Sequence, residues 1–187
     1  VHEKDYFAAK ELSKEVYDTR METLGNGTVT FQSKHDYAVS LLAYSEYGLE
    51  NSEEAKCIHN DAEHLLRDVY NSFKDKFGIN DVRTLSSLDS LAGAISKSSP
   101  KEAKAFYFLV YNERTKLLTL DHPDVVTSAF NYGNFIYENS NDLESLYEAK
   151  RYLNEAYDRR YSNYGSDHEK TKKVKYLLQE VEKKTKP

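Results

Sequence analysis

Residues 119–165 read TLDHPDVVTSAFNYGNFIYENSNDLESLYEAKRYLNEAYDRRYSNYG, and this stretch predicts two amphipathic helices joined by a short polar break. We expect the first helix over 123–137 and the second over 143–164, because their apolar residues recur at offsets of three and four. Gly165 then closes the second helix, since glycine tolerates the left-handed conformation at which helices commonly stop. The stretch therefore predicts an antiparallel helical hairpin.

The same arrangement recurs along the chain. The turn signal at Gly165 has an earlier counterpart at Gly78, and the small residues Ala103 and Ala149 stand at corresponding places 46 positions apart. A period that stays within about 40 to 50 residues indicates stacked helical hairpins, because a single hairpin cannot bury its apolar face alone. We predict an all-α fold without a sheet, in one domain over 1–187, with antiparallel hairpins at 36–78, 82–118 and 123–165 and a C-terminal capping helix over 167–184.

The amino-terminal quarter departs from this regularity. A first helix is expected over 6–23, ended by the glycines at 25 and 27. The segment 28–34 is polar and β-branched, and we interpret it as a loop. The next helices are expected over 36–47 and 53–77, the second with a long apolar stripe.

Composition narrows the class of protein. The net charge of −5 argues against binding nucleic acid, and no apolar run approaches the roughly 20 residues that span a bilayer. The single cysteine, Cys57, cannot form an internal disulfide, which favours a reducing compartment such as the cytoplasm, with an organelle as the alternative. The last helix is rich in lysine, a pattern typical of a solvated face; the alternative is an acidic partner at that end.

The sequence contains no recognisable catalytic or metal-binding pattern. His59 and His64 are five residues apart, about 140° around a helix, so they do not share a face as zinc ligands must. Cys57 lacks the neighbours that activate a thiolate. We interpret His122 and His168 as structural residues of the turns. The sequence therefore predicts no enzyme, no metal and no cofactor.

The motifs at these turns resemble a known family. Asp121-His122-Pro123-Asp124-Val125, followed by Asn131-Tyr132-Gly133, is similar to the tetratricopeptide repeat (TPR) of the long type found in kinesin light chains. The resemblance covers roughly residues 36–178. It implies a TPR-like right-handed superhelix that binds a peptide or partner protein in its concave groove, as a cargo, chaperone or protease-substrate adaptor.

Two functions remain open at this point. If the domain is a peptide adaptor, the short helices are expected to line the groove with Ser87, Ser90, Ser128, Asn131 and Phe135. The resemblance implies that Asn131 holds the peptide backbone, while a hydrogen bond within its own repeat is the alternative. The other function is an oligomerisation or regulatory accessory domain of a larger protein or enzyme, with a homo-oligomer as one form. The ends of the sequence, which resemble those of an excised segment, are compatible with it.

Overall fold

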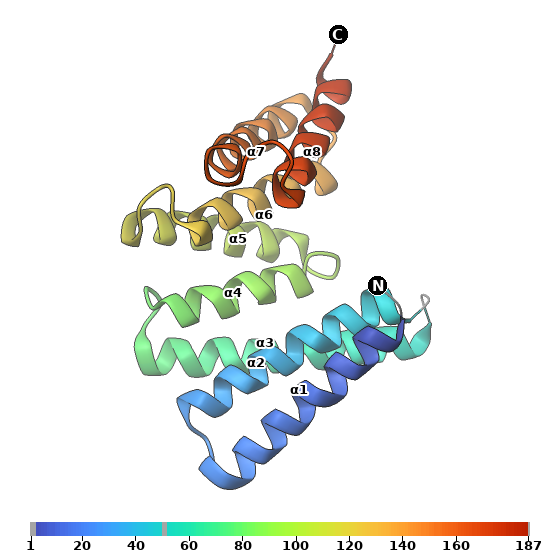
Figure 1. The fold of residues 1–187 in the computed structure, drawn as a ribbon, viewed down its shortest axis with the longest axis vertical. Coiled ribbons are helices and arrows are strands. Elements are labelled where there is room, and N and C mark those ends of the chain that lie inside the picture. The colour runs from blue at the N-terminus through green and yellow to red at the C-terminus, as the bar shows by residue number, and fades with distance from the viewer. Residues whose placement is uncertain (1–2, 50–51, 187) are drawn as a thin grey trace. The chain divides into compact units, whose positions relative to one another are not determined.

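The structure is a computed structural model that describes residues 3–49 and 52–186, and the described residues form helices joined by turns, with no strand among them. The helices divide into two compact units, Val1–Lys97 and Ser98–Pro187. Within each unit, successive helices lie against one another (Figure 1). Expectations for residues 1, 2, 50, 51 and 187 lie outside the described residues.

The first unit contains α1 (Glu3–Leu24), α2 (Thr28–Ala43), a π-helical turn (Tyr44–Gly48), α3 (Glu53–Phe77) and α4 (Val82–Ala94). Its core forms where the apolar stripes of α2, α3 and α4 face one another. The largest fully buried side chains of this unit are Leu66, Val69, Phe73, Leu85, Leu88, Leu91 and Ile95.

Helix α1 contributes little to that core. None of the residues from Lys4 to Leu24 is fully buried. The helix lies on α2 through aromatic and polar contacts: the rings of Tyr17 and Tyr37 stack with centroids 6.2 Å apart, and the Ser13 and Ser40 hydroxyls are 2.6 Å apart.

The second unit contains α5 (Pro100–Leu117), α6 (Pro123–Asn139), α7 (Leu143–Tyr164) and α8 (Glu169–Thr185). Helix α6 is buried along most of its length, and α7 crosses it closely at Gly133. A Cβ atom at Gly133 would meet the backbone oxygen of Ala149 at 3.2 Å and the Cγ atom of Leu153 at 3.0 Å. The missing side chain therefore permits this crossing.

Helix ends follow the turn signals in the sequence. Gly78 and Gly165 adopt φ values of 83° and 79°, in the left-handed region that favours glycine. His122 and His168 each accept a backbone N–H through Nδ1, at 3.2 Å, and so cap the amino ends of α6 and α8. Their predicted structural role in the turns is confirmed.

Tyrosines fill the space between α5, α6 and α7. The ring of Tyr152 lies 5.1 Å from that of Tyr111 and 4.8 Å from that of Tyr132. Both outer phenols donate to carboxylates of α7: Tyr111 to Glu155 at 2.8 Å, and Tyr132 to Glu148 at 3.0 Å. Burial, and then these hydrogen bonds, raise the pKa of Tyr111 and Tyr132 above that of a free tyrosine.

The expected helices are confirmed in number and order, with corrections in the amino-terminal quarter. The loop predicted over 28–34 is wrong, because α2 already begins at Thr28. Thr30 and Ser33 are buried, and the Phe31 ring lies 6.1 Å from that of Phe73. Packing thus outweighs the weak helix propensity of this segment. The end of the helix expected over 36–47 is a π-helical turn rather than α-helix.

Candidate functional site

A polar stripe runs along the accessible side of α6. It consists of Thr127, Asn131, Asn134 and Glu138, which follow one another at offsets of four, three and four and so share one helix face. All four side chains reach the surface, while the remainder of the helix is largely buried. The Asn134 amide donates to the Glu138 carboxylate at 3.0 Å. We call these residues the α6 polar stripe.

Of the predicted site residues in this unit, only Asn131 belongs to the stripe. Ser128 is buried, and its hydroxyl donates to the backbone oxygen of Asp124 at 2.7 Å and accepts from Arg114 Nη1 at 2.8 Å. Phe135 is also buried, with its ring 5.4 Å from that of Tyr107. Ser128 and Phe135 therefore hold the helices together and do not present their side chains to a ligand.

The two predicted residues of α4 lie in the first unit. Ser87 is fully buried and donates to the backbone oxygen of Thr84 at 2.8 Å. Ser90 is partly exposed, with its hydroxyl 3.0 Å from Nε2 of His35 on α2. Ser90 and Asn131 are thus the predicted residues at the surface, and ligand contact by either stays a prediction.

The three predicted site residues that are buried were misplaced for one reason. Ser87, Ser128 and Phe135 each stand one position after a partly exposed residue, namely Ser86, Thr127 and Asn134. One residue turns an α-helix by about 100°, so an assignment shifted by one position moves a side chain from the surface into the core. The predicted period is correct, but three of the five predicted residues stand one position away from the accessible face.

A small cavity adjoins the α6 polar stripe where the amino ends of α6 and α8 meet the carboxyl end of α7. Its volume is about 20 Å³, and its lining includes Thr127 of the stripe together with Arg160, Asn163, Tyr164 and Lys170. Arg160 is only 5% exposed, and its guanidinium carbon lies 4.4 Å from the centre of the Phe130 ring. Burial lowers the pKa of this guanidinium, because the charged form loses hydration.

Sequence reasoning missed Arg160, although a signal was present. Arg114 and Arg160 are 46 residues apart, the same spacing as Ala103 and Ala149, and each stands eight residues before a capping histidine. Both arginines are 5% exposed. A charged residue that recurs at the repeat period occupies equivalent positions in successive repeats. Here these equivalent positions are buried.

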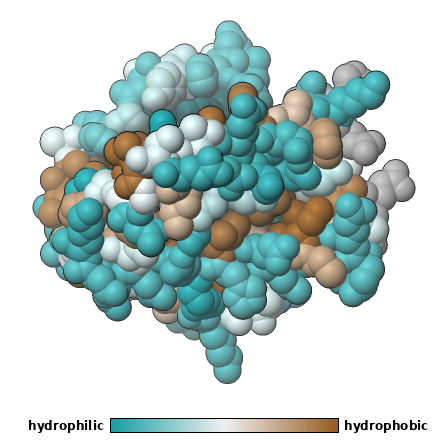
Figure 2. Space-filling model, turned by 90° about the horizontal axis from the view of Figure 1, so that it is seen from below, coloured by the Kyte–Doolittle hydropathy of each residue, from teal (hydrophilic) through white to brown (hydrophobic). Residues whose placement is uncertain are grey.

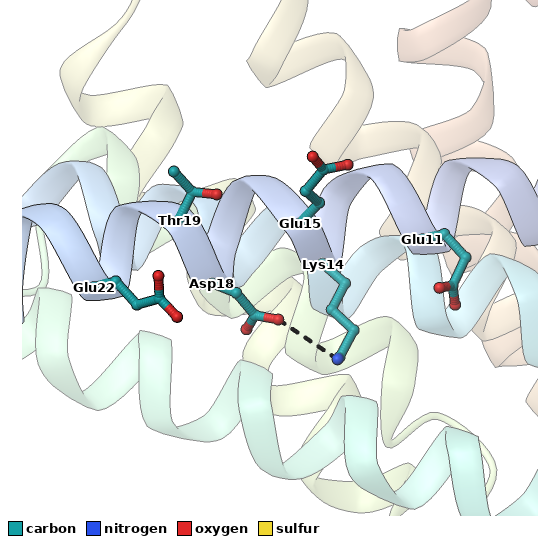
Figure 3. A pocket seen from close by; sticks show the side chains of 6 residues that line it. All are labelled: Glu11, Lys14, Glu15, Asp18, Thr19 and Glu22. Atoms are coloured by element: carbon teal, nitrogen blue, oxygen red, sulfur yellow. Dashed lines mark ion pairs between the residues drawn. The ribbon is translucent and has the colours of Figure 1, made fainter.

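Two larger hollows lie in the first unit. One, of about 330 Å³, is bordered only by side chains of α1, where Lys14 pairs with Asp18 at 3.5 Å beside Glu11, Glu15 and Glu22 (Figure 3). A hollow with walls from a single helix does not enclose a ligand. The other, of about 240 Å³, lies between α1, α2 and α3, and an ion pair between Lys34 and Asp68 already occupies its rim.

The face in Figure 2 is largely hydrophilic, with exposed apolar side chains in small separate areas. Among the described residues, no group of histidine, cysteine and acidic side chains could hold a metal ion, and Cys57 is exposed on α3. No described helix has the length and apolarity required to cross a membrane.

Comparison with known proteins places the fold. No protein-family model matches the chain, and no curated protein sequence matches it. Among solved structures, the TPR-like repeats of a Podosopora anserina protein described as a kinesin light chain superpose on 96% of this chain, with a TM-score of 0.68 and 19% identity over 78% of that chain. A single-substitution variant of the same protein gives a TM-score of 0.69 with the same identity and coverage.

The chain has a TPR-like fold. At 19% identity the similarity concerns the fold alone. The expected fold class and the resemblance to TPR repeats are therefore confirmed.

Proposed function

We propose that this TPR-like domain binds an extended peptide segment of a partner protein along the α6 polar stripe. In this proposal the domain has no catalytic activity of its own and acts as an adaptor for cargo, chaperones or protease substrates. The observation that carries the proposal is the row of hydroxyl, amide and carboxylate groups at Thr127, Asn131, Asn134 and Glu138, on a helix that is otherwise mostly buried.

The chemistry of the stripe matches a peptide backbone. An asparagine amide offers two donors and an acceptor, so it can pair with both the N–H and the C=O of one peptide unit. From Thr127 to Glu138 the helix rises by about 16 Å, which equals the length of about five residues of extended chain. The stripe is therefore long enough to read a short linear motif, which is a common mode of recognition by helical repeats.

The test begins with peptides selected from a random display library on the purified domain. Asn131→Ala should weaken their binding about 2- to 12-fold, the loss of one hydrogen bond of about 0.5 to 1.5 kcal/mol. Asn154→Ala is the matched control, because Asn154 is exposed on α7 and lies outside the stripe. Equal affinities of wild type and Asn131→Ala, measured by calorimetry on folded protein, would refute the assignment of the stripe.

Self-association is a second candidate, because the two end helices carry complementary charge. Helix α1 has an acidic face with Glu11, Glu15, Asp18 and Glu22, and α8 exposes a basic face with Lys172, Lys175 and Lys183. Copies that associate through these faces would separate as salt screens the charges. Sedimentation velocity at low and high salt tests this candidate, and a monomer at every salt concentration would exclude it.

The net charge of −5 leads us to expect no nucleic-acid partner. The acidic face of α1 would further repel phosphates. A band-shift assay at low salt with single- and double-stranded DNA is the direct test, and salt-sensitive binding there would contradict this expectation.

A further inference from the structure

The guanidinium of Arg160 is buried, and no acidic side chain of the described residues lies in an ion pair with it. Its Nη1 atom donates to the backbone oxygen of Lys170 at 3.3 Å, and its face lies on the Phe130 ring. No carboxylate of the described residues forms an ion pair with it. Buried charges are normally paired or hydrogen-bonded at several atoms, because they lose hydration. Arg160 therefore has donor capacity that its own surroundings leave unused.

Arg114 shows what the same position looks like when it is satisfied. It is equally buried, and its Nη1 atom donates to the Ser128 hydroxyl at 2.8 Å and to the backbone oxygen of Asp124 at 3.4 Å. Ser128 stands six residues after the capping histidine of α6. The corresponding residue of α8 is Val174, whose methyl groups cannot accept a hydrogen bond. At this position α6 thus offers a hydroxyl acceptor to the arginine, and α8 offers none.

The cavity lies beside the arginine that lacks this acceptor. Its volume of about 20 Å³ is enough for one water-sized group. Lys170 adds a second positive charge to its lining, and the amino ends of α6 and α8 add positive partial charge. Asn163 and Thr127 supply further hydrogen-bonding groups. Size, charge and donors all suit a single oxygen of an anionic group.

We propose that the Arg160 cavity binds one carboxylate of the partner peptide, which inserts an oxygen toward the guanidinium while its chain continues along the α6 polar stripe. Thr127 lies in both the cavity lining and the stripe, so the two sites adjoin. This inference rests on the proposed function and adds the chemical class of the ligand: a peptide with an acidic side chain or a free carboxyl end at one fixed place.

Sodium acetate is the probe, because it presents a carboxylate without a peptide. The Nε–Hε signal of Arg160, identified by its loss in Arg160→Lys, should shift saturably with acetate at constant ionic strength, whereas neutral acetamide should leave it in place. No saturable shift with acetate, or an equal shift with acetamide, would overturn the inference.

A pair of valine substitutions provides the control. Val174→Thr places a hydroxyl where Ser128 stands beside Arg114, so it should occupy Nη1 and weaken acetate binding about 3- to 10-fold. Val181→Thr introduces the same hydroxyl in the same buried cluster of α8 and should leave acetate affinity unchanged. Equal acetate affinities for the two variants would contradict the role of Arg160.

Two further probes separate the sources of the carboxylate. N-acetylglutamate N-methylamide carries a side-chain carboxylate, and N-acetyl-glycylglycine carries a chain-end carboxylate. The probe that binds the domain with the higher affinity identifies which kind of carboxylate the cavity accepts. Failure here is distinct from failure of the proposed function. Acetate binding at Arg160 with no effect of Asn131→Ala on selected peptides would refute the stripe alone, and the reverse result would refute the cavity alone.

Discussion

Gly133 is the position at which one added methyl group tests the packing of the second unit. In Gly133→Ala the new Cβ would lie 3.0 Å from Leu153 Cγ and 3.2 Å from both Ala149 O and Leu153 N. Optimal separations between carbon atoms are about 3.5 to 4.0 Å. Two of the three neighbouring atoms belong to the backbone of α7, and Leu153 is fully buried, so α7 itself has to move.

Two opposing effects determine how far Gly133→Ala changes the free energy of unfolding. Alanine in a helix interior is more stable than glycine by about 0.5 to 1 kcal/mol, whereas overpacking a core costs about 1 to 3 kcal/mol. Because the strained atoms are backbone atoms, we expect the cost to prevail and the free energy of unfolding to fall by about 1 to 2 kcal/mol. The assay is urea unfolding followed by far-ultraviolet circular dichroism.

Two variants serve as controls for this prediction. Asn134→Ala changes the next residue of the same helix on its accessible side, and it should change stability by less than about 0.5 kcal/mol. In a Leu153→Ala background the added methyl group should cost less, because one of its close neighbours is gone. A gain in stability of about 1 kcal/mol for Gly133→Ala alone would refute a tight crossing of α6 and α7.

Two predictions concern buried hydrogen bonds of the second unit. Ser128→Ala removes the hydroxyl that accepts a hydrogen bond from buried Arg114, and we expect the free energy of unfolding to fall by about 1 to 3 kcal/mol. The control, Ser162→Ala on the surface of α7, should have little effect. Equal urea midpoints for wild type and Ser128→Ala would show that Arg114 finds another acceptor. The raised pKa of the Tyr132 phenol means that the native state holds its proton more tightly than the unfolded chain does, so this stabilisation is complete below the unfolded pKa of about 10 and is lost as pH rises toward the native value. Urea unfolding at increasing pH should therefore show a steeper alkaline loss of stability for wild type than for Tyr132→Phe, and parallel curves would contradict the assignment.

The sequence was sufficient to predict the helices that carry strong periodicity and clear turn signals. Residues 143–164 were assigned to a helix with the bounds that α7 has, because Asp142 caps it and Gly165 ends it. The segment at 28–34 was misassigned because its propensity is weak and its helix depends on contacts with α3, such as that of Phe31 with Phe73. Such contacts join residues far apart in the sequence, and local patterns do not contain them.

The candidate site was predicted only in part, for a similar reason. Periodicity selects a helix face within about one residue, and one residue separates Thr127 at the surface from Ser128 in the core. Asn131 was placed on the accessible side, whereas Arg160 was passed over because burial of an arginine is rare and leaves no apolar pattern. Its repetition at the spacing of Arg114 was the available signal.

The contacts of α1 have a consequence for the motions of the first unit. This helix is held by ring stacking and a pair of hydroxyls and contributes no fully buried side chain from Lys4 to Leu24. Detaching it therefore leaves the packing of Leu66, Phe73 and Leu88 in place. Local opening energies follow the apolar contacts that are broken, so backbone amides of α1 should exchange with deuterium long before those in the middle of α3. We therefore expect α1 to open as a separate segment, before the middle of α3 does.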